Sequence, residues 1–230
     1  MPVPAEPRVE KGEMSLFVKA TEMLNWNANR SGYGRGSRTF DREGTAAPVP
    51  AGEITFHERI GAHDISVVRV NDRASFVGWV TTYLRKAGVD HPVIPNTMIG
   101  NVEEYLSEGF SWFVFDVVSL QASPRTNEAI QYRFETNRIF YPLKISRTGQ
   151  GQTSVDILIL TYPLHAKFLG LPEHNVKKIY SMFVDQSALD QLDAAFPYFF
   201  RHESNALLSL WRIQGDLKSF DKDLIVTDTE

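Results

Sequence analysis

Two histidines and an aspartate of the types that bind metals lie close together in the first half of the chain. His57 and His63 flank a predicted tight turn, and Asp64 follows directly. Neutral imidazole and carboxylate are ligands that zinc accepts. The spacing matches no metal-ligand pattern and no further ligand is evident, so we predict no bound metal. The three residues stay a candidate polar cluster, and a metal-dependent or other hydrolase that uses them is one alternative function.

Other catalytic arrangements are weaker in this sequence. The segment around Ser111 begins like a nucleophile elbow, but it lacks the glycine two residues after the serine and no helix pattern follows. Glu103 and Glu104 are adjacent, so their side chains diverge on a helix, and Asp190 and Asp193 fall on the polar face of a short helix. We expect both pairs to be solvated surface rather than an acid–base pair in an apolar pocket. No catalytic residue and no cofactor is predicted.

A glycine- and arginine-containing stretch is the second candidate region. Residues 25–52 are rich in Asn, Gly, Arg, Ser and Pro and show little periodicity, which indicates a mobile surface loop. Tyr33, Arg35 and Arg38 make it a candidate mobile binding loop. It lacks the lysine of a phosphate-binding loop. Weak RNA binding through residues 30–38, by charge and stacking, is a further alternative function.

The helices that must position these residues follow from apolar residues at helical spacing. A helix is predicted after Asn71-Asp72, which can serve as its N-cap, and it ends at Gly88. A second one ends at Gly109 and forms a pair with the first. Two shorter helices are predicted over residues 13–24 and 186–195.

The strands follow from alternating or continuous apolar residues. They are predicted over residues 53–60, 63–70, 110–120, 129–136, 139–146, 153–161, 204–213 and 222–227. Consecutive strands without a helix between them favour antiparallel pairing. The predicted fold class is therefore α+β, with a mainly antiparallel sheet and a helix pair packed on it. We expect an extended segment, a short helix and a mobile loop over residues 1–52, and a single α+β domain over residues 53–230.

Composition and charge limit the function classes. The chain has 230 residues, 43% of them hydrophobic and 23% charged, which is enough for a large core. A net charge of -4 and a pI near 5.9 disfavour a polyanion as the main partner, so we predict no DNA binding. The chain has no cysteine, which excludes disulfides, thiolate metal sites and cysteine nucleophiles. No apolar run approaches the length of a membrane-spanning helix.

Several stretches resemble an uncharacterised family of bacterial and archaeal envelope proteins, known as domain of unknown function 2330. The resemblance covers most of residues 53–146. It rests on a Pro-rich opening, a glycine-marked start of a strand, a helix with a tryptophan, an aromatic strand and a Tyr-Pro-Leu step. These stretches are Pro2–Pro7, Ile60–Ile65, the helix with Phe76, Trp79 and Leu84, Tyr105–Val114 (YLSEGFSWFV) and Tyr141–Ser146.

The resemblance implies an exported protein and carries no activity with it. This chain departs from the family in the insert over residues 25–52, in the missing cysteines and in the missing signal peptide; its Pro-rich opening leads us to expect an upstream segment in a longer chain. The leading hypothesis is a non-catalytic extracytoplasmic domain that acts in binding or envelope architecture. Its partner is unknown, and another envelope protein is one option.

Overall fold

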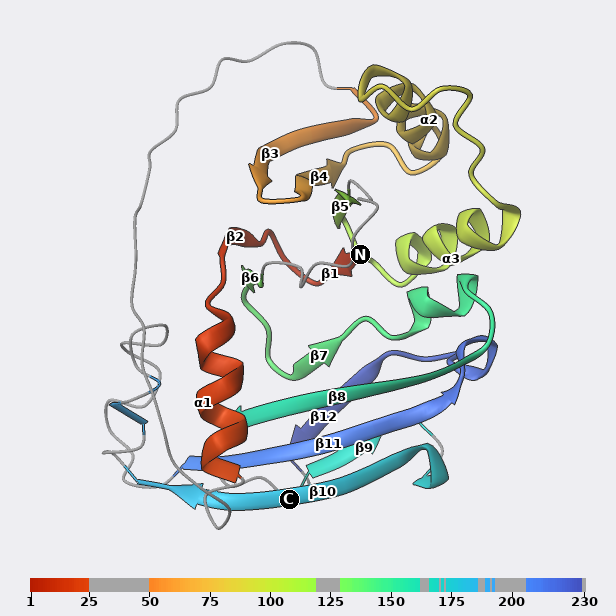
Figure 1. Ribbon diagram of the computed structural model, residues 1–230. Helices are drawn as coiled ribbons and strands as arrows, with labels where there is room; N and C mark the ends of the chain where they lie inside the picture. Colours follow the sequence, from red (N-terminus) through yellow and green to blue (C-terminus); the bar gives the residue numbers. More distant parts are fainter. Residues whose placement is uncertain are drawn as a thin grey trace. The chain divides into compact units, whose positions relative to one another are not determined.

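The computed structural model describes residues 1–24, 50–118, 129–161, 166–169, 171, 173–185, 189–190, 192 and 206–228. These residues form two compact units (Figure 1). The first unit holds the described residues of Met1–Gly12, Arg38–Asn137 and Lys144–Thr148, and the second those of Glu13–Ser37, Arg138–Leu143 and Gly149–Glu230. The units do not follow the expected boundary after residue 52. That the two units fold as one domain, as expected for residues 53–230, stays a prediction.

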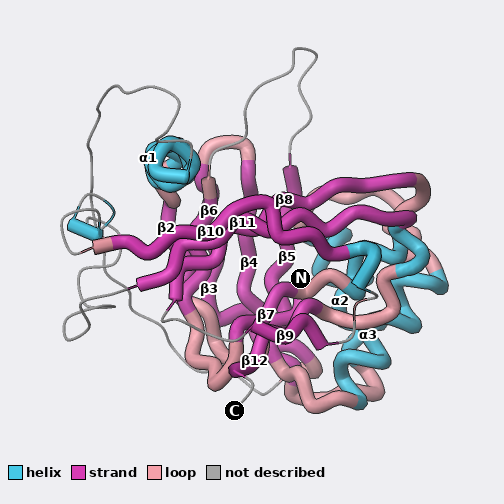
Figure 2. Tube along the Cα trace, turned by 90° about the horizontal axis from the view of Figure 1, so that it is seen from below, coloured by secondary structure: helices cyan, strands magenta, loops and turns pink. Residues whose placement is uncertain are grey.

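Antiparallel strands dominate the part of the chain that the structure describes, and three longer helices accompany them (Figure 2). The helices are α1 (Met14–Leu24), α2 (Phe76–Lys86) and α3 (Asn96–Ser107). Every strand pairing among the described residues is antiparallel. The predicted α+β class with mainly antiparallel sheets is confirmed. None of the described helices has the length and apolar character needed to cross a membrane.

The first unit is built on a four-stranded sheet in the order β1-β5-β4-β3. Its strands are β1 (Pro2–Val3), β5 (Trp112–Val118), β4 (His63–Val70) and β3 (Gly52–Ile60). Strands β3 and β4 form a hairpin whose turn uses Gly61 at a φ of 60°, which favours glycine. A separate pair joins β2 (Arg8–Lys11) to β6 (Ile130–Arg133).

Both faces of this sheet are covered, because successive side chains of β4 alternate between them. Ile65 and Val67 lie in one apolar cluster with residues of β1, β2 and β5. Val68 lies in another cluster with side chains of both helices, among them Phe76 of α2 and Tyr105 of α3. Both aromatic side chains are fully buried, and burial of Phe76 alone stabilises the unit by roughly 1.5–3 kcal/mol.

The second unit contains two three-stranded sheets. One has the order β10-β11-β8, with β10 (Val176–Val184), β11 (Ala206–Asp216) and β8 (Gln152–Thr161). The other has the order β7-β12-β9, with β7 (Ile139–Tyr141), β12 (Leu224–Asp228) and β9 (Ala166–Leu169). Ile213 of β11 and Leu224 of β12 belong to one buried cluster, so side chains of both sheets share a core.

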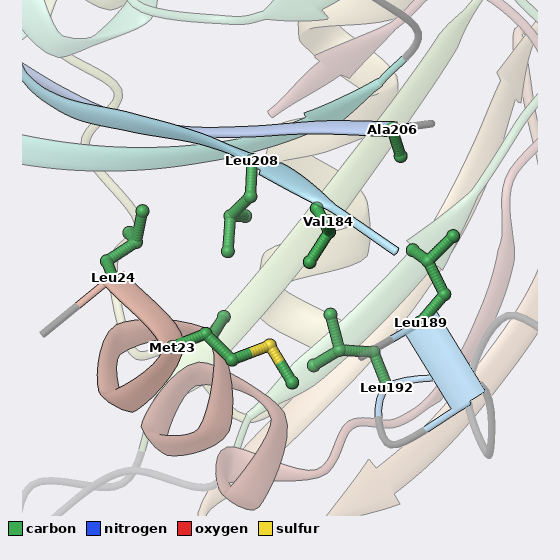
Figure 3. Close-up of a cluster of buried hydrophobic side chains, with 8 residues drawn as sticks. Met23, Leu24, Val184, Leu189, Leu192, Ala206 and Leu208 are labelled. Atoms are coloured by element: carbon green, nitrogen blue, oxygen red, sulfur yellow. The ribbon is translucent and has the colours of Figure 1, made fainter. Parts of the chain in front are cut away.

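Helix α1 covers the opposite face of β11. Met23 and Leu24 at its end face Leu208 and Val184, and Leu189 and Leu192 close the group from the other side (Figure 3). The apolar residues of α1 recur at helical spacing, which is why one side of the helix is buried here.

Short 3₁₀ turns complete the fold: η2 (Lys144–Thr148), η3 (Glu173–Asn175) and η4 (Leu217–Ser219). The strand predicted over residues 139–146 is wrong in its second half, because the chain leaves β7 at Tyr141 and turns into η2. Pro142 has no N–H with which to continue the ladder. Strands β9 and β10 were not expected from the sequence.

Candidate functional site

His57 and Asp64 form an exposed pair on the β3–β4 hairpin. His57 Nε2 lies 2.5 Å from Asp64 Oδ1. His57 is directly opposite Ser66 in the register, and the buried Ser66 hydroxyl shares a hydrogen bond of 2.7 Å with the hydroxyl of Tyr83 in α2. Both members of the pair therefore lie on the face of the sheet that α2 covers.

His63 lies on the other face, because it immediately precedes Asp64 in the same strand. Its Nδ1 is 2.8 Å from Asp116 Oδ2 of β5, and its buried Nε2 has no hydrogen-bond partner among the described residues. Burial, together with the charge of Asp116, raises the pKa of nearby Tyr132 to about 12. Of the three residues, Tyr132 packs against the apolar cluster that contains Ile65 and Val67.

The predicted polar cluster of His57, His63 and Asp64 is therefore divided into two separate pairs. The sequence suggested convergence at a turn, but all three residues lie within strands, where neighbours point apart. Among the described residues, no three histidine or carboxylate side chains are placed to hold a metal ion. The candidate loop residues Tyr33, Arg35 and Arg38 lie outside the described part of the chain.

A buried lysine organises the most extensive ion-pair network of the first unit. Lys144 is 3% exposed, and its Nζ lies 2.6 Å from Glu108 Oε1 and 3.3 Å from Glu104 Oε1. The Nζ also sits 4.2 Å from the ring centroid of Tyr105. Arg147 donates to Glu104 and to Asn101. Burial opposes ionisation of Glu104, yet the hydrogen bonds from Arg147 and Lys144 hold its pKa below the usual value. The network attaches η2 to α3, which is a structural role.

Among the strands of the second unit whose side chains are described throughout, β10 exposes the most apolar side chains. It pairs with β11 on one side, and no described strand pairs with its other side. Phe183 is 64% exposed, Tyr180 43% and Ile179 39%. The register shifts between Lys178 and Tyr180, which leaves Ile179 as an unpaired bulge residue. Residues Tyr180–Val184 after the bulge contain no charge, glycine or proline.

The other long edge strands carry charges that β10 lacks after its bulge. Edge strand β3 exposes Glu58 and Arg59 and contains a register shift of its own. Edge strand β8 carries Asp156, which Arg212 of β11 binds through two hydrogen bonds of 2.6 and 2.7 Å. Charges and bulges are the usual protection of sheet edges. Among these three long edge strands, the half of β10 beyond Ile179 is the least protected.

Sequence reasoning missed β10 although a signal was present. Val, Ile, Tyr and Phe are concentrated in residues 176–184, a composition typical of strands. The bulge at Ile179 breaks the alternation that would otherwise identify a strand.

Comparisons with family models, with curated proteins and with solved structures gave no match to this chain. The family resemblance of residues 53–146 stays a prediction.

Proposed function

We propose that this protein is a binding domain that takes up an extended segment of a partner protein as an additional strand on the free edge of β10. The observation that carries the proposal is the exposure of Phe183 and Tyr180 on an edge strand whose second half has no charge. Strand addition of this kind gains main-chain hydrogen bonds along the edge, and the neighbouring side chains give specificity.

The two aromatic side chains flank the docking edge from opposite faces of the sheet. Phe183 is opposite Leu207, and Tyr180 is opposite Leu210. Because Leu207 and Leu210 are three positions apart on β11, an added strand would contact Phe183 on one face and Tyr180 on the other. Each cross-strand contact with an aromatic side chain contributes roughly 0.2–1 kcal/mol.

Binding through a strand edge requires no catalytic group. The proposal therefore agrees with the hypothesis of a non-catalytic domain, and of its two roles, binding or envelope architecture, it chooses binding. We further predict that the protein is extracytoplasmic and that its partner is another envelope protein. Cell fractionation with an antibody against the chain tests the location, and recovery only from the cytosol would contradict it.

A peptide selection tests strand addition directly. Random decapeptides are selected for binding to the wild-type protein, and their affinities are measured by fluorescence anisotropy for Phe183→Lys and Phe17→Lys. Phe17 is the matched control, because it is an exposed phenylalanine of the same unit on α1. We expect Phe183→Lys to weaken binding at least several-fold and Phe17→Lys to leave it unchanged. Equal binding by all three proteins would refute the proposed function.

A further inference from the structure

We infer, resting on the proposed function, that the segment taken up by β10 is acidic at one end. Two adjacent Asp or Glu residues of the partner strand lie opposite Lys178 and Lys177, and apolar residues lie opposite Tyr180 and Phe183. The partner is therefore an extended acidic–apolar segment of another protein.

The two lysines leave an uncompensated positive charge at the start of β10. Both are exposed, and neither forms an ion pair with any residue in the described part of the chain. Lys178 lies over the ring of Trp211, 5.0 Å from its centroid. The nearest cation on the neighbouring strand, Arg212, is opposite Lys177 and already paired with Asp156. A docking strand thus meets net positive charge here.

The register of β11 gives the spacing that an added strand must satisfy. Phe183, Tyr180, Lys178 and Lys177 are opposite Leu207, Leu210, Trp211 and Arg212. Ile179, the bulge residue, has no counterpart on β11, so it takes up no position in this spacing. An antiparallel strand on the free edge then presents an apolar residue at its first position, a second apolar residue at its fourth, and acidic residues at its fifth and sixth.

A second copy of β10 does not meet this requirement. Residues Val176–Val184 contain no Asp or Glu, so pairing of β10 with itself leaves all four lysines without a partner charge. The chain is also acidic overall, with a net charge of -4, so two copies repel each other weakly. Charge complementarity therefore favours a different protein as the source of the strand.

Lysines on a sheet edge can also serve to repel other strands. The two roles differ in what happens when the charge is removed. A repelling lysine weakens the binding of every strand, so its loss strengthens the binding of neutral peptides. A recognising lysine favours acidic strands, so its loss weakens the binding of those peptides selectively.

The test uses two fluorescein-labelled decapeptides of Thr and Val in this register. One carries Glu at the fifth and sixth positions, and the other carries Gln there. At low ionic strength we expect the Glu peptide to bind wild-type protein about 2- to 30-fold more tightly, the range for two exposed ion pairs. The preference should shrink at high ionic strength. In the double variant Lys177→Glu, Lys178→Glu the preference should pass to a peptide with Lys at these two positions.

The outcomes separate this inference from the proposed function. If the Gln peptide binds as tightly as the Glu peptide, or more tightly, and Phe183→Lys still weakens both, the acidic recognition is refuted and strand addition stands. If neither peptide binds and selected peptides are insensitive to Phe183→Lys, strand addition itself is refuted.

Discussion

Replacement of Lys144 tests how the first unit holds its only described 3₁₀ turn against α3. The side chain is 3% exposed and contacts two carboxylates and the ring of Tyr105. Lys144→Ala removes both the packing of the aliphatic stem and the charge. Lys144→Met keeps most of the stem and removes only the charge, so the two variants separate the contributions.

The magnitudes follow from these contacts. Alanine removes the three methylene groups beyond Cβ, at about 0.8 kcal/mol each. The ion pairs contribute about 1 kcal/mol, because Glu104 and Glu108 are partly exposed and keep water when Lys144 is lost. We therefore expect Lys144→Ala to lower the free energy of unfolding by about 3–4 kcal/mol and Lys144→Met to lower it by about 1 kcal/mol.

Urea denaturation followed by tryptophan fluorescence measures both values. Lys86→Ala is the control, because Lys86 is an exposed lysine of α2 in the same unit, and it should change stability by less than about 0.5 kcal/mol. A loss below about 1 kcal/mol for Lys144→Ala, or a methionine variant less stable than the alanine variant, would contradict the assignment of Lys144 as a buried, packed ion-pair partner.

Three further changes have defined outcomes. In Gly52→Ala the added Cβ would lie 2.7 Å from the ring of Trp79, so calorimetry should show a loss of about 1–3 kcal/mol. In Gly109→Ala the φ of 94° is unfavourable for alanine, so urea denaturation should show a loss of about 1–2 kcal/mol. Tyr132 has a folded-state pKa of about 12 against an ordinary value of 10.0, so its stabilising effect is complete below pH 10 and lost between pH 10 and 12. Burial also raises the pKa of Tyr141, so Tyr132→Phe should reduce the alkaline loss of stability rather than remove all of it. An unchanged pH profile of stability would contradict the burial of the Tyr132 hydroxyl.

The elements that the sequence predicts well are those with an uninterrupted pattern. Residues 63–70 combine an isoleucine and three valines, with no glycine or proline, and form β4. The apolar stripe of α2 runs between a polar start and Gly88, and Gly88 takes the left-handed conformation expected after a helix. Residues 110–120 were expected to form a strand, and β5 lies there, between β1 and β4 with apolar clusters on either side of the sheet.

The functional residues were harder to identify for two physical reasons. The first reason is that the hydrogen-bond partner of a histidine can lie far away in the sequence. His63 pairs with Asp116 of a different strand, and no local sequence pattern reveals this. The exposure of Phe183 depends on β10 being at an edge, a property of sheet order rather than of sequence.

Amide hydrogen exchange measures whether the outer edge of β10 is open in the free protein and covered when a peptide binds. In the free protein, the outward-facing amides of Tyr180–Val184 should exchange quickly while those of β11, between two strands, stay protected. Saturation with a selected peptide should protect the outward-facing amides of Tyr180–Val184 in the wild-type protein and not in Phe183→Lys. Protection of β10 equal to that of β11 before any peptide is added, or no change on binding, would contradict strand addition at this edge.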